Sequence, residues 1–119
     1  MTTKEIAHRL VELCKKGDFE TAQKELYADD ALSIEPYAGM GFEKEVKGLK
    51  AIKEKSALWN SMVEEYHGME VSDPIIAPNS FALTMSMDVT MKGRGRSTMS
   101  EICLYKIKDG KIISEEFIV

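Results

Sequence analysis

The sequence has few cysteines and no long hydrophobic run. Its two cysteines, Cys14 and Cys103, are far apart, and each lies within an apolar pattern. Disulfide-stabilised secreted domains carry more cysteines at closer spacing, so we expect two buried free thiols in a reducing, cytoplasmic environment. No apolar run approaches the roughly 20 residues that cross a bilayer, and the first residues lack the features of a signal peptide. We therefore expect no membrane partner.

Positive charge is also scarce, with 16 Lys and Arg against 20 Asp and Glu and a net charge of −4. Binding to nucleic-acid phosphates requires clustered basic residues. The one basic cluster, Gly-Arg-Gly-Arg at 93–96, has the composition of a hairpin turn. We therefore expect no nucleic-acid partner.

What is present is the composition of an ordinary globular protein. The 119 residues are 44% hydrophobic and 30% charged, which suits one domain over residues 1–119 with one core. A chain of this length has no room for a separate cofactor domain, so we expect no cofactor.

The first half of the chain shows helical spacing. Thr2 and Glu5 match a capping box, and apolar residues then repeat every three or four positions until Gly17. Asp18 can cap a second short helix. A short strand at 31–35 ends at Pro36, a mobile loop over 36–47 follows, and a third helix is predicted from Gly48 up to Gly68.

The second half alternates between apolar and polar residues. This alternation predicts strands over residues 81–91, 96–107 and 111–119. The last two strands are joined by Lys108-Asp109-Gly110, which is a strong hairpin signal.

Three short motifs match a known family. They are Lys-Gly-Asp-Phe at 16–19, Tyr-Ala-Asp-Asp-Ala at 27–31 leading to Glu35-Pro36, and Asp-Gly-Lys-Ile-Ile at 109–113. With the predicted element order, they make the chain resemble the nuclear transport factor 2-like superfamily, and within it the SnoaL-like, polyketide-cyclase-related domains. This resemblance implies an α+β roll of the cystatin-like kind. In this fold a cone-shaped, curved antiparallel sheet wraps around N-terminal helices and encloses a pocket.

Candidate catalytic residues follow from strand alternation and from this resemblance. Alternation places Glu101, Glu115 and His67 on the same side as their apolar neighbours, facing the expected pocket. Glu35 lies where the similar ketosteroid isomerases carry a catalytic aspartate. A partly desolvated carboxylate there would be a better base near neutral pH, whereas the alternative for Glu35 is an exposed acid at a strand end.

The resemblance to the isomerases also implies an oxyanion hole made by a tyrosine and a protonated aspartic acid. The tyrosine position holds Leu10 here, and the acid position falls near Cys103. Tyr105 or a protonated Glu101 would have to supply the missing donor. Carboxylates with His67 could instead hold iron or zinc, but no compact ligand spacing is present and we assign no metal.

Apolar side chains on the same inner side are candidates for binding a substrate, although each could equally be core. They are Trp59, Met69, Met85, Met87, Met99, Tyr105 and Phe117.

Three hypotheses for the function remain open. The chain could be a cofactor-independent isomerase, cyclase or dehydratase that uses acid/base chemistry on a small apolar carbonyl compound. It could also be a non-catalytic binding module for a hydrophobic metabolite, or a structural dimer without a ligand. The outer strand face is predicted to form a homodimer. It carries mostly small side chains with an apolar patch, namely Ala82, Thr84, Ser86, Asp88, Ser100, Ile102 and Leu104.

Overall fold

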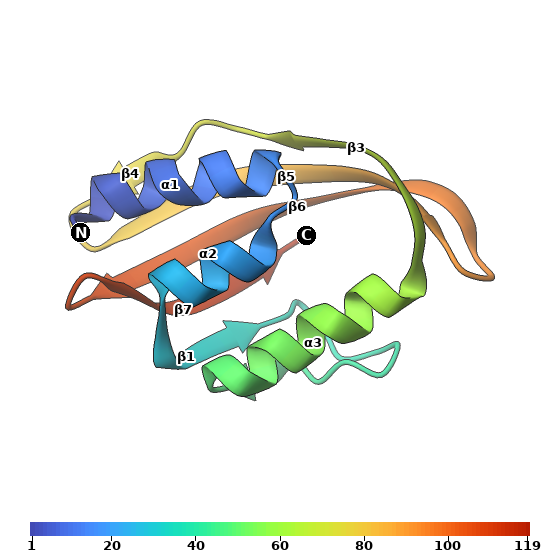
Figure 1. The fold of residues 1–119 in the computed structure, drawn as a ribbon, viewed down its shortest axis with the longest axis horizontal. Coiled ribbons are helices and arrows are strands. Elements are labelled where there is room, and N and C mark those ends of the chain that lie inside the picture. The colour runs from blue at the N-terminus through green and yellow to red at the C-terminus, as the bar shows by residue number, and fades with distance from the viewer.

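Three helices pack on the concave side of one curved sheet of seven strands (Figure 1). The computed structural model describes all residues 1–119. The elements in chain order are α1 Thr3–Lys15, α2 Phe19–Leu26, β1 Tyr27–Ile34, β2 Glu45–Lys47, α3 Leu49–Met62, β3 Val63–Val71, β4 Ile75–Ala77, β5 Ser80–Met91, β6 Gly95–Lys108 and β7 Lys111–Ile118.

The strand order is β2-β1-β7-β6-β5-β3, with β4 paired to β5 outside this path. The predicted α+β class with a curved sheet is confirmed, and the sheet is open. One pairing is not antiparallel, because β1 runs parallel to β7. These two strands are far apart in sequence, and parallel neighbours need such a long connection.

The N-terminal helix forms as the sequence predicts. The hydroxyl of Thr2 accepts a hydrogen bond from the Glu5 amide at 3.1 Å, and Glu5 Oε1 accepts one from the Thr2 amide at 2.8 Å. Gly17 then ends the segment with a φ of +70°, a conformation that glycine adopts without strain.

The core lies between α1, α2 and the concave face of the sheet. It is one cluster of 18 buried hydrophobic residues, in which the Phe81 and Tyr105 rings stack with centroids 4.9 Å apart. Both cysteines are free and buried there. None of the three helices combines the length and the apolar character that a membrane-spanning helix requires.

The prediction of the third helix is wrong at its C-terminal end. The helix stops at Met62, and residues 63–71 form β3, which pairs with β5 through Val63 opposite Met91 and Tyr66 opposite Val89. Pairing with a neighbouring strand has overridden the local helical spacing.

Two further boundaries differ from the prediction. The first strand begins at Tyr27, earlier than expected, and the segment assigned to a loop contains β2, which pairs with β1. Pairing with β7 and β2 extends β1 beyond what its own apolar pattern indicates.

Candidate active site

Strands β1, β6 and β7 and helix α3 bring three glutamates around one lysine. Glu115 on β7 lies opposite Ser33 of β1 and Tyr105 of β6. Glu35 follows directly after β1, and Lys55 lies on the helix above. These side chains come from four separate parts of the chain, and the curvature of the sheet gathers them at one place.

Glu115 is the most deeply buried acid of this group, with only 5% of the residue exposed. The Tyr27 hydroxyl donates a hydrogen bond to Glu115 Oε1, and Ser33 Oγ donates to Oε2 at 2.6 Å. Burial raises the pKa of Glu115, while these two hydrogen bonds act in the opposite direction. Burial also raises the pKa of Tyr27 well above its usual range, so its proton is held at neutral pH.

Lys55 connects the buried acid to a second carboxylate. Its Nζ donates to Ser33 Oγ at 2.7 Å and lies 2.6 Å from Glu35 Oε1. A lysine ammonium can only donate, so Ser33 Oγ accepts a hydrogen bond from Lys55 and uses its own hydroxyl hydrogen to donate one to Glu115. The same Nζ lies 5.2 Å from the centre of the Phe117 ring, within cation–π distance. The ammonium group is thereby held on three sides.

Glu101 on β6 is the third carboxylate. Burial, with the charge of Glu35 as the second cause, raises the pKa of Glu101 to about 7. Its Oε1 lies 3.8 Å from Cys103 Sγ, a weak donor, and Lys55 lowers the pKa only in part. At neutral pH this carboxyl group therefore exists both with and without its proton.

The prediction that His67 faces the pocket is wrong. His67 is hydrogen-bonded through Nε2 to Thr90 Oγ1 at 2.7 Å, and Nε2 lies 3.8 Å from Glu65. The β3–β5 register shifts between Tyr66 and Gly68, so alternation is interrupted at this point. Tyr66, opposite buried Val89, faces the concave side, and His67 turns to the outer face with Thr90.

The seven apolar candidates do not share one environment. Met85 and Tyr105 are buried in the core, and Met69, Met87 and Phe117 pack against it while partly exposed. Met99 is 39% exposed at the far end of β6.

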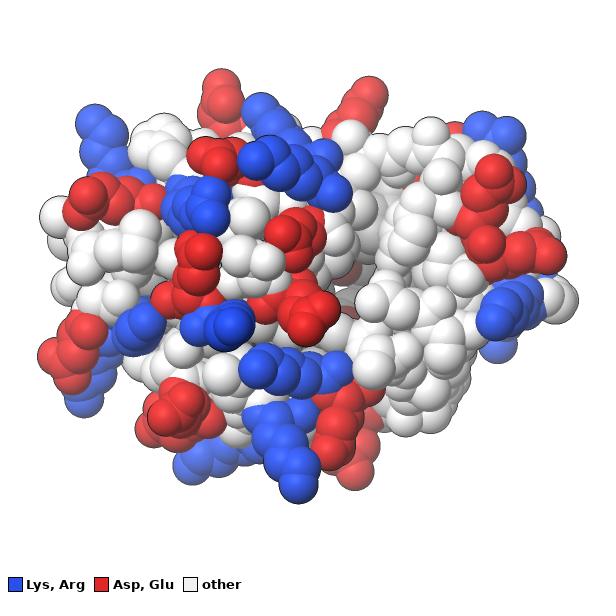
Figure 2. All heavy atoms as spheres, in the orientation of Figure 1, with Lys and Arg blue, Asp and Glu red and all other residues white.

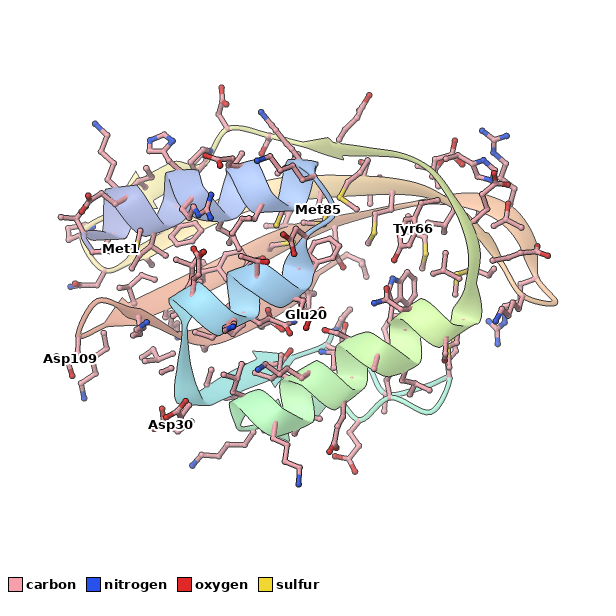
Figure 3. The ribbon with its side chains drawn as sticks, viewed as in Figure 1. Met1, Glu20, Asp30, Tyr66, Met85 and Asp109 are labelled. Carbon is pink, nitrogen blue, oxygen red and sulfur yellow. The ribbon has the colours of Figure 1, made fainter.

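Trp59 is partly buried on α3, and its Nε1 donates to the Tyr66 hydroxyl at 2.9 Å. In Figure 3 Tyr66 lies between β3 and α3, whereas Met85 lies near the C-terminal end of α1. Seen from outside, Figure 2 shows a hollow between α2 and α3 with acidic residues at its edge.

Sequence analysis missed Tyr27, Ser33 and Lys55. Lys55 had a detectable signal, because it lies three residues after Ile52 and four before Trp59, within the apolar stripe of its helix. Ser33 has the same strand parity as Glu35. Tyr27 had no such signal, since the β1–β7 register shifts between Tyr27 and Leu32.

No three or more side chains of His, Cys, Asp and Glu are grouped in a way that could hold a metal ion. What the arrangement can do is move a proton. It combines a carboxyl group that is half protonated near neutral pH with a fixed ammonium group that can stabilise negative charge.

The chain belongs to the SnoaL-like domain family, whose model matches residues 1–119. A protein from Mesorhizobium loti, described as a candidate SnoaL-like polyketide cyclase, is 39% identical with a TM-score of 0.92, and the match covers 100% of both chains. No curated protein matches the sequence.

More distant structures show the same fold. A nuclear transport factor 2-like protein from Burkholderia pseudomallei is 14% identical with a TM-score of 0.80, covering 98% of this chain and 90% of that one. A protein of ketosteroid isomerase-like fold from Catenulispora acidiphila, in complex with trimethylamine, is 17% identical with a TM-score of 0.75. The match covers 99% of this chain and 87% of that one.

Proposed function

We propose that this chain is a cofactor-independent enzyme that transfers a proton at a carbon next to the carbonyl group of a small apolar compound. Isomerisation, aldol-type cyclisation and dehydration all begin with this step. The observation that carries the proposal is the grouping of Glu101, Glu35 and Glu115 around Lys55, in which the carboxyl of Glu101 has a pKa of about 7.

Glu101 is the general base in this mechanism. A base is most effective when its pKa lies near the working pH, and Glu101 meets that condition. It takes the proton from the substrate carbon onto a carboxylate oxygen, and the electron pair of the C–H bond moves toward the carbonyl oxygen to form an enolate. Return of the proton to a different carbon completes an isomerisation.

Lys55 stabilises the enolate oxygen. The resemblance to the ketosteroid isomerases puts Leu10 and a position near Cys103 where those enzymes carry oxyanion donors. Lys55 Nζ lies 2.6 Å from Glu35 and lowers the pKa of Glu101. A fixed positive charge in a site with little water stabilises developing negative charge strongly. Glu35 and Ser33 hold Lys55 in place, and Glu115 and Tyr27 in turn hold Ser33.

The comparisons support this class of chemistry. The relative with 39% identity is described as a candidate polyketide cyclase, and a more distant structure from Bacillus subtilis, 18% identical, is described as a candidate isomerase. Cyclisation and isomerisation of carbonyl compounds both use the enolate that Glu101 and Lys55 would form.

The test is deuterium exchange next to the carbonyl in a panel of mono- and bicyclic ketones in D2O, followed by NMR. Glu101→Gln should slow exchange at least 100-fold while the fold is retained by circular dichroism. Glu116→Gln is the matched control, because Glu116 neighbours Glu115 in β7 but lies on the opposite face. Exchange at the wild-type rate in Glu101→Gln would reject the proposal.

A binding module for a hydrophobic metabolite is the second candidate. It is favoured by Glu115, whose two oxygens are both satisfied by protein hydroxyls, as in a structural anchor. In that case Glu35→Gln and Glu101→Gln change ligand affinity, and no ketone in the panel exchanges its protons.

We also propose a homodimer formed through the outer face of β5, β6 and β7. Ile102 and Ile118 are cross-strand neighbours with exposed fractions of 46% and 41%, and Leu104 lies two residues further along β6. Light scattering at micromolar concentration should report twice the mass of one chain, and Ile102→Glu should reduce the measured mass to that of a single chain. A wild-type monomer would remove this proposal.

The two cysteines support a location in the reducing cytoplasm. Cys14 and Cys103 are both free and buried, and burial raises the pKa of the Cys14 thiol to about 12, so neither is a reactive thiolate. Cell fractionation tests this location.

A further inference from the structure

A second hollow lies away from the acid cluster, at the end of the β5–β6 hairpin. It has a volume of about 210 Å³ and is lined by Met40, Met62, Met91, Lys92 and Arg94. In Figure 1 the hairpin projects beside the C-terminal end of α3 and the loop that precedes β2. Met85 is the cross-strand partner of Glu101, and Met91 lies six residues further along β5. At roughly 3.3 Å per residue, the distance between Met85 and Met91 along the strand is about 20 Å.

The hollow combines an apolar floor with unpaired positive charge. Met91 is 5% exposed and Met62 is partly buried, so two thioether side chains are fixed in the wall, while Met40 is 40% exposed at the edge. Neither Lys92 nor Arg94 lies within ion-pair distance of a carboxylate. The guanidinium of Arg94 donates instead to Met40 Sδ at 3.4 Å, and a thioether is a weak acceptor.

The backbone holds both basic residues in position. The Lys92 amide donates to the Met62 carbonyl at 2.9 Å, which ties the hairpin to the end of α3, and the Arg94 amide donates to the Met91 carbonyl at 3.0 Å. Gly93 between them has a φ of +75°, which allows the tight turn. The two charges are therefore attached to a fixed turn.

We propose that this hollow binds an amphipathic carboxylate, with the apolar chain against Met62 and Met91 and the carboxylate on Arg94 and Lys92. Methionine side chains adapt to aliphatic chains of varied shape, and arginine binds a carboxylate through two parallel N–H donors. The volume is below the roughly 300 Å³ at which a drug-sized ligand is enclosed, so one end of the molecule is held and the rest stays outside. This site goes beyond the proposed function, because it does not require Glu101 to be a base.

The experiment measures decanoate binding by isothermal titration calorimetry, with acetate and 1-decanol as comparison ligands. Decanoate should bind more tightly than either, since acetate lacks the chain and decanol lacks the charge. Arg94→Gln should weaken decanoate binding about tenfold and leave decanol unaffected. The matched control is Arg96→Gln, because Arg96 is on the same hairpin but is already paired with Asp88 at 2.8 Å. Equal affinity in wild type and Arg94→Gln, or equal weakening by Arg96→Gln, would overturn the proposal.

Methionine methyl groups locate the ligand directly. In protein labelled with ¹³C at the methionine methyls, decanoate should shift the signals of Met40, Met62 and Met91, assigned by single Met→Leu variants. Shifts confined to Met85 and Met87 would place decanoate at the acid cluster and would also overturn the proposal.

Discussion

The Nζ of Lys55 lies 2.6 Å from Oε1 of Glu35, and the exposed fractions of the two side chains are only 13% and 24%. A charge withdrawn from water to this degree requires a partner. Glu35 is that partner, so Lys55 can compensate the charges of Glu101 and Glu115 only in part. The cluster therefore has more carboxylates than positive charges. Protonation of Glu101, whose pKa is about 7, reduces this excess of negative charge.

Replacing Lys55 by Met should raise the pKa of Glu101 further, because the ammonium now lowers it. The measurement is a pH titration of ¹³C-labelled glutamate carboxyl signals, with Glu101→Gln used for assignment. Lys53→Met, an exposed change on the same helix, is the control and should leave the titration unchanged. A Glu101 titration that is the same in Lys55→Met and wild type would contradict this account of the cluster.

Glu101→Gln should make the protein more stable at pH 8 but not at pH 4. The folded-state pKa of about 7 is above the ordinary 4.5, so folding favours the protonated form. The stability that this proton provides is fully present below pH 4.5 and is lost as the pH rises through 7. The difference corresponds to roughly 3 kcal/mol in the free energy of unfolding, measured by urea denaturation. If the free energy of unfolding of the wild type does not fall between pH 5 and 8 relative to that of Glu101→Gln, the raised pKa of Glu101 is contradicted.

Tyr27→Phe should lower the free energy of unfolding by about 1–3 kcal/mol, because it leaves a buried oxygen of Glu115 without its donor. In the double variant with Glu115→Gln, the loss in the free energy of unfolding should be smaller than the sum of the two single losses, since both substitutions remove the same interaction. Tyr37→Phe, at an exposed tyrosine, is the control and should change little. Fully additive losses would show that the two groups are not coupled.

His67→Ala should leave the titration of Glu101 unchanged. His67 is hydrogen-bonded to Thr90 on the outer face of the sheet and makes no hydrogen bond or ion pair with Glu35, Glu101 or Glu115. The same ¹³C titration tests this, and Thr90→Ser serves as a control that keeps the hydroxyl. A shift of the Glu101 titration in His67→Ala would place His67 back among the site residues.

Much of the fold could be predicted from local sequence. The capping box at Thr2 and Glu5 and the alternation through β5 both formed as expected, because they depend on interactions between near neighbours. Alternation also placed Glu101 and Glu115 on the concave face. It failed for His67, where a single irregularity in the pairing of β3 reversed the side on which the residue lies.

The sequence by itself determined the α+β architecture, the capped first helix and the presence of carboxylates among apolar neighbours, since each follows from spacing along one segment. Only the tertiary structure decided that Lys55 from α3 meets Glu35 and Ser33 from the β1 region and that Tyr27 and Ser33 both donate to Glu115. These contacts depend on how β1 is placed against β7 and how α3 crosses above them. The half-protonated state of Glu101 likewise arises from burial and from charges that are distant in the chain, and no local pattern records them.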